Sequence, residues 1–287
     1  MTEHALSFAA GGRLTGILTE PDTDRCRPGA PLVLSSNVGI NHHVGPYRFF
    51  VDLSRALARR GFASLRFDLS GLGNSGARKD TLGDLQRAVD DHVEAMNFLA
   101  TRGYRRFVPV GFCSSVDAAH GIALRDERVV GVCFIEGYTF RTRGFFLRYP
   151  LRLFDRARWR RVLSRKMPPI LRDLPGLRRL GRFATAFAGQ DQVFLREYPE
   201  PADLRRDYEA LIARGTHQLF IYTGDDNYNH QGQFLEFTGL PSLGPTMKIV
   251  HLPEADHTLF RVADRDHAIA LVCDWMEVTA VASYGPR

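Results

Sequence analysis

The sequence lacks the features of a membrane-spanning or secreted protein. No stretch approaches the roughly 18 consecutive apolar residues that a transmembrane helix needs. The first residues, Met1-Thr2-Glu3-His4-Ala5, have neither the basic nor the apolar region of a secretory signal. We therefore expect a cytoplasmic protein.

Cysteine and metal-ligand patterns are equally sparse. The chain has 4 cysteines, and their wide spacing matches neither a zinc site nor a disulfide framework, so we expect them to be reduced. The adjacent His42 and His43 are not accompanied by a carboxylate cluster, and their spacing is not that of a zinc site. We expect no metal and no cofactor, and we predict that both histidines line the entrance of a site.

Positive charge is concentrated in one segment. The net charge is +6, yet residues 141–182 contain 14 Lys or Arg and 2 acidic residues, which gives this segment a charge of +12. Such a density of like charge is self-repelling unless anions lie close by, which indicates an anionic partner. Nucleic acid is not expected, because no helix-turn-helix, RNP or zinc-finger motif accompanies the charge.

The 287 residues suffice for one large core, and buried strands alternate with helical patterns along most of the chain. This alternation predicts an α/β fold with a mainly parallel sheet flanked by helices. It stops at residue 138 and resumes after residue 215. We therefore predict a core formed by residues 1–137 and 216–287, and an inserted helical lid, basic and rich in aromatics, formed by residues 138–215.

The most informative stretch is a short apolar strand at 107–110, followed by small residues and a helix at 114–124. It resembles the nucleophile elbow of the α/β-hydrolases, in which small residues lie two positions before and two positions after the nucleophile. Cys113 fits, because Gly111 and Ser115 occupy those positions. Ser114 would be flanked by Phe112 and Val116 and does not fit.

Ser115 is the remaining alternative, with Cys113 and Asp117 as its flanking residues. A thiolate is favoured near a helix N-terminus and beside a histidine, and the elbow would place Cys113 there. We therefore predict Cys113 as the nucleophile and Phe112, beside it, as a substrate-binding residue together with His42 and His43. The alternative interpretation is that Cys113 is a small buried residue before a helix.

Two glycine-containing turns, each following a buried strand, have different interpretations. The turn after the strand at 32–36 would donate a backbone N–H to an oxyanion hole, with Val38 or Gly39 as the donor and Ser114 as the second donor. The stretch 68–76, Asp-Leu-Ser-Gly-Leu-Gly-Asn-Ser-Gly, lacks the Lys-Ser or Lys-Thr end of a P-loop. We interpret it as a structural turn.

Nearly the whole chain resembles the α/β-hydrolase superfamily, and within it the bacterial hydrolases associated with exosortase and exopolysaccharide gene clusters. The resemblance depends on residues 37–48, on Phe-Asp-Leu-Ser-Gly-Leu-Gly at 67–73 and on the Cys-Ser elbow. The G-x-C-x-small elbow also resembles dienelactone hydrolase, whose nucleophile is a cysteine.

The resemblance implies a triad in the order nucleophile, acid, histidine. Asp226, after a late strand, and His257, in the loop after the last strand, satisfy this order with Cys113. Alternatives for the acid are Asp225 and, less favoured, Glu136. The alternatives for the base lie inside a strand (His251) and inside the last helix (His267).

The implied chemistry is acyl transfer through an acyl-cysteine. A cysteine nucleophile suits thioester substrates, and the basic lid suits a substrate carried by coenzyme A or by an acidic acyl carrier protein. Thioesterase, acyltransferase and esterase activities all fit this pattern. The alternatives are a lactone hydrolase or carboxylesterase acting on a neutral ester, a protein that docks on anionic membranes through the lid, and a non-catalytic accessory protein.

Overall fold

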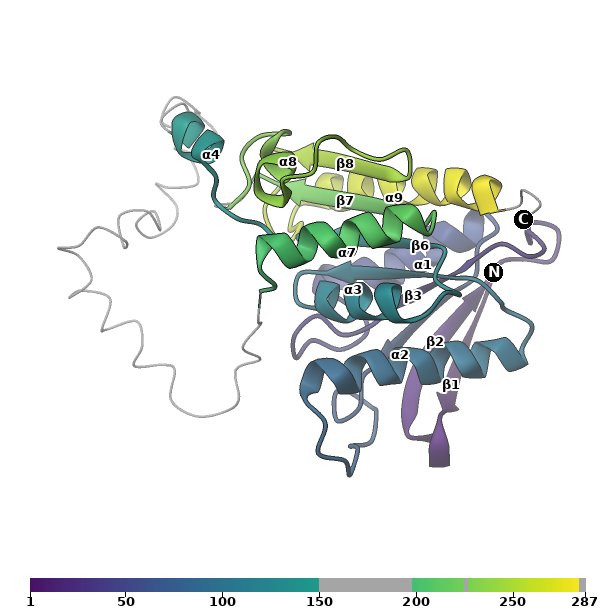
Figure 1. The fold of residues 1–287 in the computed structure, drawn as a ribbon. Coiled ribbons are helices and arrows are strands. Elements are labelled where there is room, and N and C mark those ends of the chain that lie inside the picture. Colours follow the sequence, from purple (N-terminus) through teal and green to yellow (C-terminus); the bar gives the residue numbers. More distant parts are fainter. Residues whose placement is uncertain (150–197, 225–226, 284–287) are drawn as a thin grey trace.

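The computed structural model describes residues 1–149, 198–224 and 227–283. Within these residues, one eight-stranded sheet has the order β1-β2-β4-β3-β5-β6-β7-β8 (Figure 1). The strands are β1 (Thr2–Phe8), β2 (Leu14–Glu20), β3 (Leu32–Ser35), β4 (Ser64–Asp68), β5 (Phe107–Phe112), β6 (Gly131–Ile135), β7 (His217–Thr223) and β8 (Met247–Leu252). The pairs β1·β2 and β2·β4 are antiparallel, and all other pairs are parallel. The predicted, mainly parallel α/β sheet is confirmed.

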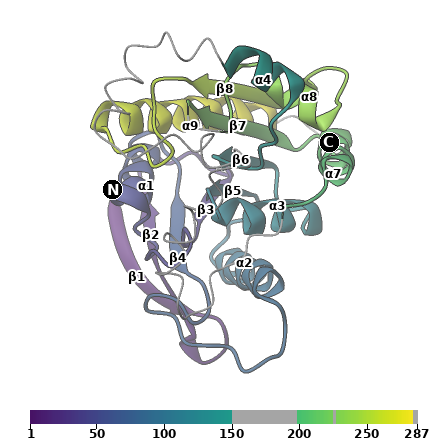
Figure 2. The same cartoon turned by 90° about the vertical axis from the view of Figure 1, so that its left-hand side faces the viewer.

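The helices cover both faces of this sheet. They are α1 (Phe49–Arg59), α2 (Asp84–Thr101), α3 (Ser115–Arg125), α4 (Arg143–Arg148), α7 (Pro201–Ala213), α8 (Gln233–Thr238) and α9 (Val262–Ser283). Figure 2 shows α1 and α9 on one face and α2, α3 and α7 on the other. Each face has its own buried apolar cluster, one of which includes Phe49 and Phe112 and the other Phe134 and Phe220.

The strand β5 runs through the middle of the sheet and ends at the predicted elbow. All six of its residues are buried, as expected for a parallel strand that is covered on both faces. Because β3, β5, β6, β7 and β8 are parallel, the loops that follow them meet at one edge of the sheet. The candidate site lies at this edge.

The predicted lid, residues 138–215, is only partly within the described residues. The part that follows residue 197 includes α7, whose Leu204, Tyr208 and Leu211 are buried against the core. The ring of Tyr208 lies 5.2 Å from that of Phe220 on β7. Most of the predicted basic segment lies outside the described residues. No helix in the described part of the chain combines the length and apolarity that crossing a bilayer requires.

Candidate active site

Cys113 occupies a sharp turn between β5 and α3, with φ of 51°. Its backbone N–H donates to the carbonyl of Ile135 over 2.8 Å, which fixes the turn against β6. A Cβ atom at Gly111 would lie 2.6 Å from Cα of Val116, so glycine is required two residues before the turn. A non-glycine residue in this left-handed conformation stores strain that typically marks a functional position. The turn therefore has the geometry predicted for a nucleophile elbow.

The rival nucleophile Ser115 is committed to the backbone of the elbow. Its hydroxyl accepts a hydrogen bond from the N–H of Phe112 over 2.7 Å and donates to the carbonyl of the same residue over 3.0 Å. Ser115 is also buried, whereas Cys113 is partly exposed. The geometry of the elbow therefore favours Cys113 over Ser115.

His257 lies in the loop that follows β8, and its ring has a partner on each side. Its Nδ1 lies 2.8 Å from Oε2 of Glu136, and the ring also forms a hydrogen bond with the side chain of Cys113. Because Nδ1 faces the carboxylate, Nε2 is the nitrogen available to the thiol. The hydrogen bonds with Cys113 and then with Glu136 raise the pKa of His257 to about 10, although burial opposes this shift.

Glu136 directly follows β6 and is held by the neighbouring strand. Its φ is 53°, and it is only 8% exposed. Its backbone N–H donates to the carbonyl of Ile221 over 2.9 Å, and its Oε1 accepts a hydrogen bond from the N–H of Thr223. Both contacts are on β7. They leave Oε2 directed at His257, so the carboxylate can orient the imidazole.

The carboxylate that contacts His257 is therefore the less favoured alternative from the sequence. The preferred acid, Asp226, and its neighbour Asp225 lie outside the described residues. Glu136 can reach His257 because β6 lies directly beside the elbow strand β5, and because glutamate is one methylene longer than aspartate. The sequence signal for it was its position immediately after a buried strand.

Phe112 has a different environment from the one we predicted. We expected it at the substrate, but its ring is 1% exposed. The ring centroid lies 5.4 Å from that of Phe49 and 6.4 Å from that of His257. Successive side chains of a strand point to opposite faces, and Phe112 points into the core on the α1 side. From its place in the core, the ring of Phe112 therefore packs near the ring of His257.

Both predicted oxyanion-hole segments meet at the elbow. The N–H of Gly39 donates to Oγ of Ser114 over 2.7 Å, while Val38 is buried. Ser114 directly precedes α3, and the first N–H groups of a helix have no intrahelical acceptor. The structure therefore brings the N–H of Gly39 to the residue after Cys113, where the hydroxyl of Ser114 accepts its hydrogen bond.

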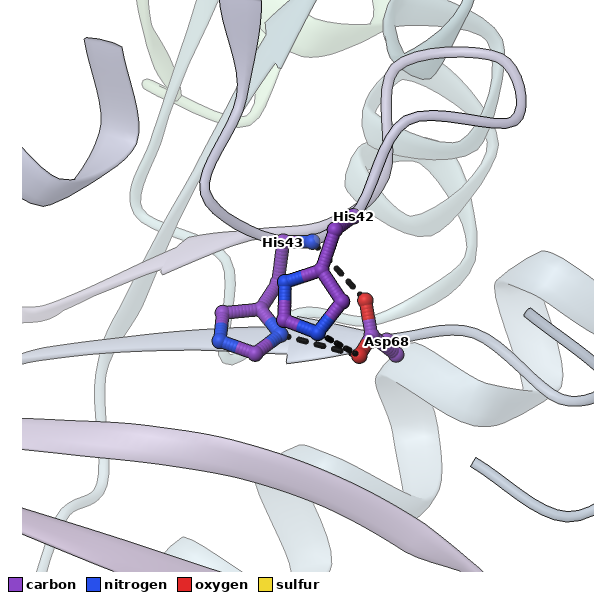
Figure 3. Close-up of side chains that lie close together, drawn as sticks. All are labelled: His42, His43 and Asp68. Carbon is purple, nitrogen blue, oxygen red and sulfur yellow. Dashed lines mark hydrogen bonds and ion pairs between the residues drawn. The ribbon is translucent and has the colours of Figure 1, made fainter. Parts of the chain in front are cut away.

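Figure 3 shows that His42 and His43, in the loop after β3, form a compact group with Asp68. The Oδ2 atom of Asp68 lies 2.9 Å from Nδ1 of His43 and 3.1 Å from Nε2 of His42. His43 and Asp68 are buried, and His42 is partly exposed. The role of the two histidines in lining the site entrance stays a prediction, and their observed contact is with Asp68.

Further donors surround the same carboxylate. Oδ1 accepts hydrogen bonds from Nδ2 of Asn37 and from the backbone N–H of His43, each over 2.8 Å. Oδ2 accepts a third from the N–H of Asn74 over 3.0 Å. Burial raises the pKa of Asp68, but hydrogen bonds from His43 and Asn74 outweigh it and bring the pKa to about 2. Asp68 thus fixes the loop after β3 to the turn after β4.

This group is also the candidate for metal binding in the described part of the chain. The ligand atoms of His42, His43 and Asp68 lie within 4.8 Å of one another. However, the carboxylate of Asp68 already accepts N–H groups on both oxygens, and an ion would have to displace them. The arrangement fits a hydrogen-bonded anchor better than a metal centre.

Gly73 makes room for this anchor. Its φ is +52°, and a Cβ atom at this position would lie 2.3 Å from the carboxylate of Asp68. The glycine-rich stretch at 68–76 is therefore a structural turn, as predicted. The sequence did not reveal that its first residue, Asp68, connects this turn to the loop after β3.

Comparison with known proteins agrees with this geometry. Residues 32–272 match the alpha/beta hydrolase family. The chain belongs to this family. The protein is accordingly an α/β-hydrolase enzyme. No curated protein matches the sequence.

Solved structures share the fold at low sequence identity. Proline iminopeptidase from Mycobacterium smegmatis is 17% identical, with a TM-score of 0.55, and the alignment covers 98% of this chain and 100% of the other. Est1E from Butyrivibrio proteoclasticus is 13% identical, with a TM-score of 0.56 and coverage of 96% and 98%. The Pyrococcus furiosus esterase PF2001 is 13% identical, with a TM-score of 0.58 and coverage of 96% and 91%. At this identity the likeness concerns the fold of the α/β-hydrolase.

Proposed function

We propose that this α/β-hydrolase is an acyl-transfer enzyme, a thioesterase or acyltransferase, that works through an acyl-cysteine at Cys113. The observation that carries the proposal is the position of His257, which forms hydrogen bonds with Cys113 on one side and with Glu136 on the other. A nucleophile, a base and a group that orients the base are the parts that covalent acyl transfer requires.

The acylation step follows from this arrangement. With a raised pKa, His257 holds the proton of the thiol as an imidazolium, so that Cys113 is a thiolate. The thiolate attacks the carbonyl carbon of the substrate and forms a C–S bond. When the tetrahedral intermediate collapses, the bond to the leaving group breaks and His257 delivers the proton to that group. Water or another acceptor then releases the acyl group by the reverse sequence.

Glu136 takes the part of the triad acid in this proposal, in place of Asp226. Its carboxylate fixes the tautomer of His257 and stabilises the imidazolium, and the contacts of Glu136 with β7 hold it in position. The order Cys113, Glu136, His257 along the chain is also the nucleophile, acid, histidine order of the family.

The oxyanion would be stabilised by the backbone N–H of Ser114 and by the hydroxyl of the same residue. That hydroxyl accepts a hydrogen bond from the N–H of Gly39, which polarises it and leaves its own proton free to donate. In this way the N–H of Gly39, in the loop after β3, acts through Ser114. Loss of one oxyanion donor typically costs about 10²-fold or more in rate.

The cysteine nucleophile favours a thioester substrate, because exchange between two thioesters is nearly balanced in free energy. The basic residues between 141 and 182 favour an anionic carrier, either coenzyme A or an acidic acyl carrier protein. We also propose that the protein is related to the hydrolases of exosortase and exopolysaccharide gene clusters. Contact of the basic segment with an anionic membrane is an additional proposal.

A second candidate is an esterase acting on a neutral small ester or lactone. The shared fold with Est1E and with the Pyrococcus furiosus esterase favours it. It uses the same Cys113, His257 and Glu136, and it differs only in the leaving group. Both candidates are acyl transfer through the same thiol.

A substrate panel distinguishes the two candidates. Matched acyl groups would be presented as coenzyme A thioesters, as acyl carrier protein thioesters and as neutral methyl esters, and release and acyl-enzyme would both be measured. We expect turnover of at least one carrier-linked thioester at a higher kcat/KM than the neutral ester. Turnover of the ester with no reaction of either thioester would leave the esterase and remove the carrier.

A further inference from the structure

A cavity of about 520 Å³ lies beside the elbow, between the loop after β4 and the first turns of α2 and α3. Its volume is in the range of small-molecule binding sites. Gly39 and Ser114, which we assign to the oxyanion hole, are among its lining residues. Cys113 and His257 are not among the lining residues, so the cavity adjoins the site through Gly39 and Ser114.

Within the described part of the chain, the lining of this cavity combines aliphatic residues with uncharged polar and acidic ones and contains no cationic side chain. Five aliphatic residues supply much of its surface, namely Leu69, Leu72, Leu85, Ala88 and Ala118. The charged residues that line it are Asp84 and Asp117, both acidic, and no Lys, Arg or His takes part. A phosphate or carboxylate would find no cation here, whereas a hydrocarbon chain would find apolar contacts.

Leu85 gives a second indication of an apolar occupant. It lies in the first turn of α2 and is 54% exposed, although the apolar residues of this helix that follow, such as Val89 and Met96, are buried. The buried residues pack on the sheet, while Leu85 lines the cavity. A chain bound in the cavity would remove part of its side chain from water.

We propose that this cavity binds the acyl group of the substrate, and that it selects a neutral hydrocarbon chain of medium length. The inference rests on the proposed function, since it places the carbonyl at Cys113 and the chain beyond Ser114. An anionic carrier would then lie outside the cavity, on the leaving-group side of the carbonyl. The cavity thus separates the apolar and the anionic parts of one substrate.

Gly83 is a position at the border of the cavity where a side chain can be added without disturbing the core. It lines the cavity, its φ is negative, and a Cβ atom at this position would meet no atom within 4 Å. Gly83→Phe would therefore place a ring in open space at the start of α2. Leu124→Phe, on the exposed C-terminal part of α3, adds an aromatic ring away from the cavity and serves as the control.

The probe is a series of N-acetylcysteamine thioesters with acetyl, butyryl, hexanoyl and succinyl groups. The rate of acylation of Cys113 is followed by intact-protein mass spectrometry, and melting temperatures show that the variants are folded. In the parent we expect the rate to rise about threefold to fourfold per added methylene up to hexanoyl. Gly83→Phe should keep the acetyl rate and lose most of the hexanoyl advantage, and Leu124→Phe should retain it.

Three results would overturn the inference. A flat dependence on chain length in the parent, or an unchanged hexanoyl preference in folded Gly83→Phe, would remove the chain from this cavity. Succinyl transfer as fast as butyryl transfer would remove the preference for a neutral chain. In each case formation of the acetyl-enzyme would still support the proposed function. A complete lack of acylation with every thioester would contradict that function and this inference together.

Discussion

Glu136 and His257 are separated by 121 positions in the chain, yet Oε2 of the carboxylate lies 2.8 Å from Nδ1 of the imidazole. Glu136 reaches this position from the end of β6, and His257 from the loop after β8. The strand between them, β7, donates the N–H of Thr223 to the other carboxylate oxygen. The contact can orient His257 toward Cys113.

Replacement of the acid tests whether Glu136 orients the histidine. Glu136→Gln keeps the shape but removes the charge that stabilises the imidazolium, so acylation of Cys113 should slow by about 10²-fold or more. Asp226→Asn should change the rate by less than about threefold under the same conditions. Glu127→Gln, at an exposed position, is the control. A large loss in Asp226→Asn with a small loss in Glu136→Gln would instead assign the acid to Asp226.

The pH dependence of alkylation tests the ion pair of Cys113 and His257. The raised pKa of His257 means that the imidazolium persists from neutral pH up to about pH 10, where it loses its proton. Cys113 should therefore react with iodoacetamide at a nearly constant rate between pH 6.5 and pH 9, because the thiolate is present throughout. The exposed Cys26 serves as a reference within the same chain.

An ordinary thiol loses reactivity about tenfold per pH unit below its pKa of about 8.5. If Cys113 follows that decline below pH 8, then His257 does not hold its proton and the ion pair is absent. Glu136→Gln should move the profile of Cys113 toward this ordinary behaviour, because it removes one of the hydrogen bonds that raise the pKa of His257.

Two substitutions with opposite expected effects test the role of the Ser114 hydroxyl in acylation. If it transmits the Gly39 hydrogen bond to the oxyanion, Ser114→Ala should slow acylation by about 10- to 100-fold. Ser114→Thr keeps the hydroxyl and should recover most of the rate. Faster acylation in Ser114→Ala would show that the hydroxyl only occupies the N–H of Gly39 and obstructs the oxyanion hole.

Asp68 should make a measurable contribution to stability. Asp68→Asn introduces a donor among the N–H groups of Asn37, His43 and Asn74, and we expect the free energy of unfolding to fall by about 2–4 kcal/mol in urea titrations. Asp24→Asn, at an exposed position, should change it by less than about 0.5 kcal/mol.

The pH dependence of that contribution follows from its lowered pKa. The folded-state pKa of about 2 lies below the unfolded value, so the stabilisation is complete above about pH 4 and is lost as the pH falls toward 2. The difference in stability between the parent and Asp68→Asn should therefore narrow in this window. A constant difference down to pH 2 would contradict the role of the ionised carboxylate.

The elbow was predictable from the sequence because its determinants are local. The buried strand, Gly111 and the start of α3 are adjacent in the chain, and crowding against Val116 explains the glycine. The choice between carboxylates was not local. It depends on which strand neighbours β5 and on the reach of the side chain, and both properties arise only when the sheet is assembled.

The surroundings of two other residues, Phe112 and Asp68, were also not predictable from the sequence alone. Phe112 adjoins the nucleophile in sequence, but the alternation of side chains along β5 directs its ring into the core. The environment of Asp68 combines groups from residues 37, 43 and 74, and their convergence depends on how the loops after β3 and β4 fold together. The residues that carry these contacts were visible in the sequence, but their partners were not.

The central claim is that Cys113 becomes acylated. The most direct measurement is the intact mass of the parent after brief incubation with an activated acyl thioester, compared with Cys113→Ala, His257→Ala and Ser115→Ala. We expect an adduct of one acyl group in the parent and in folded Ser115→Ala, none in Cys113→Ala, and slow formation in His257→Ala. An adduct that persists in Cys113→Ala and disappears in Ser115→Ala would contradict the account and assign the nucleophile to the serine.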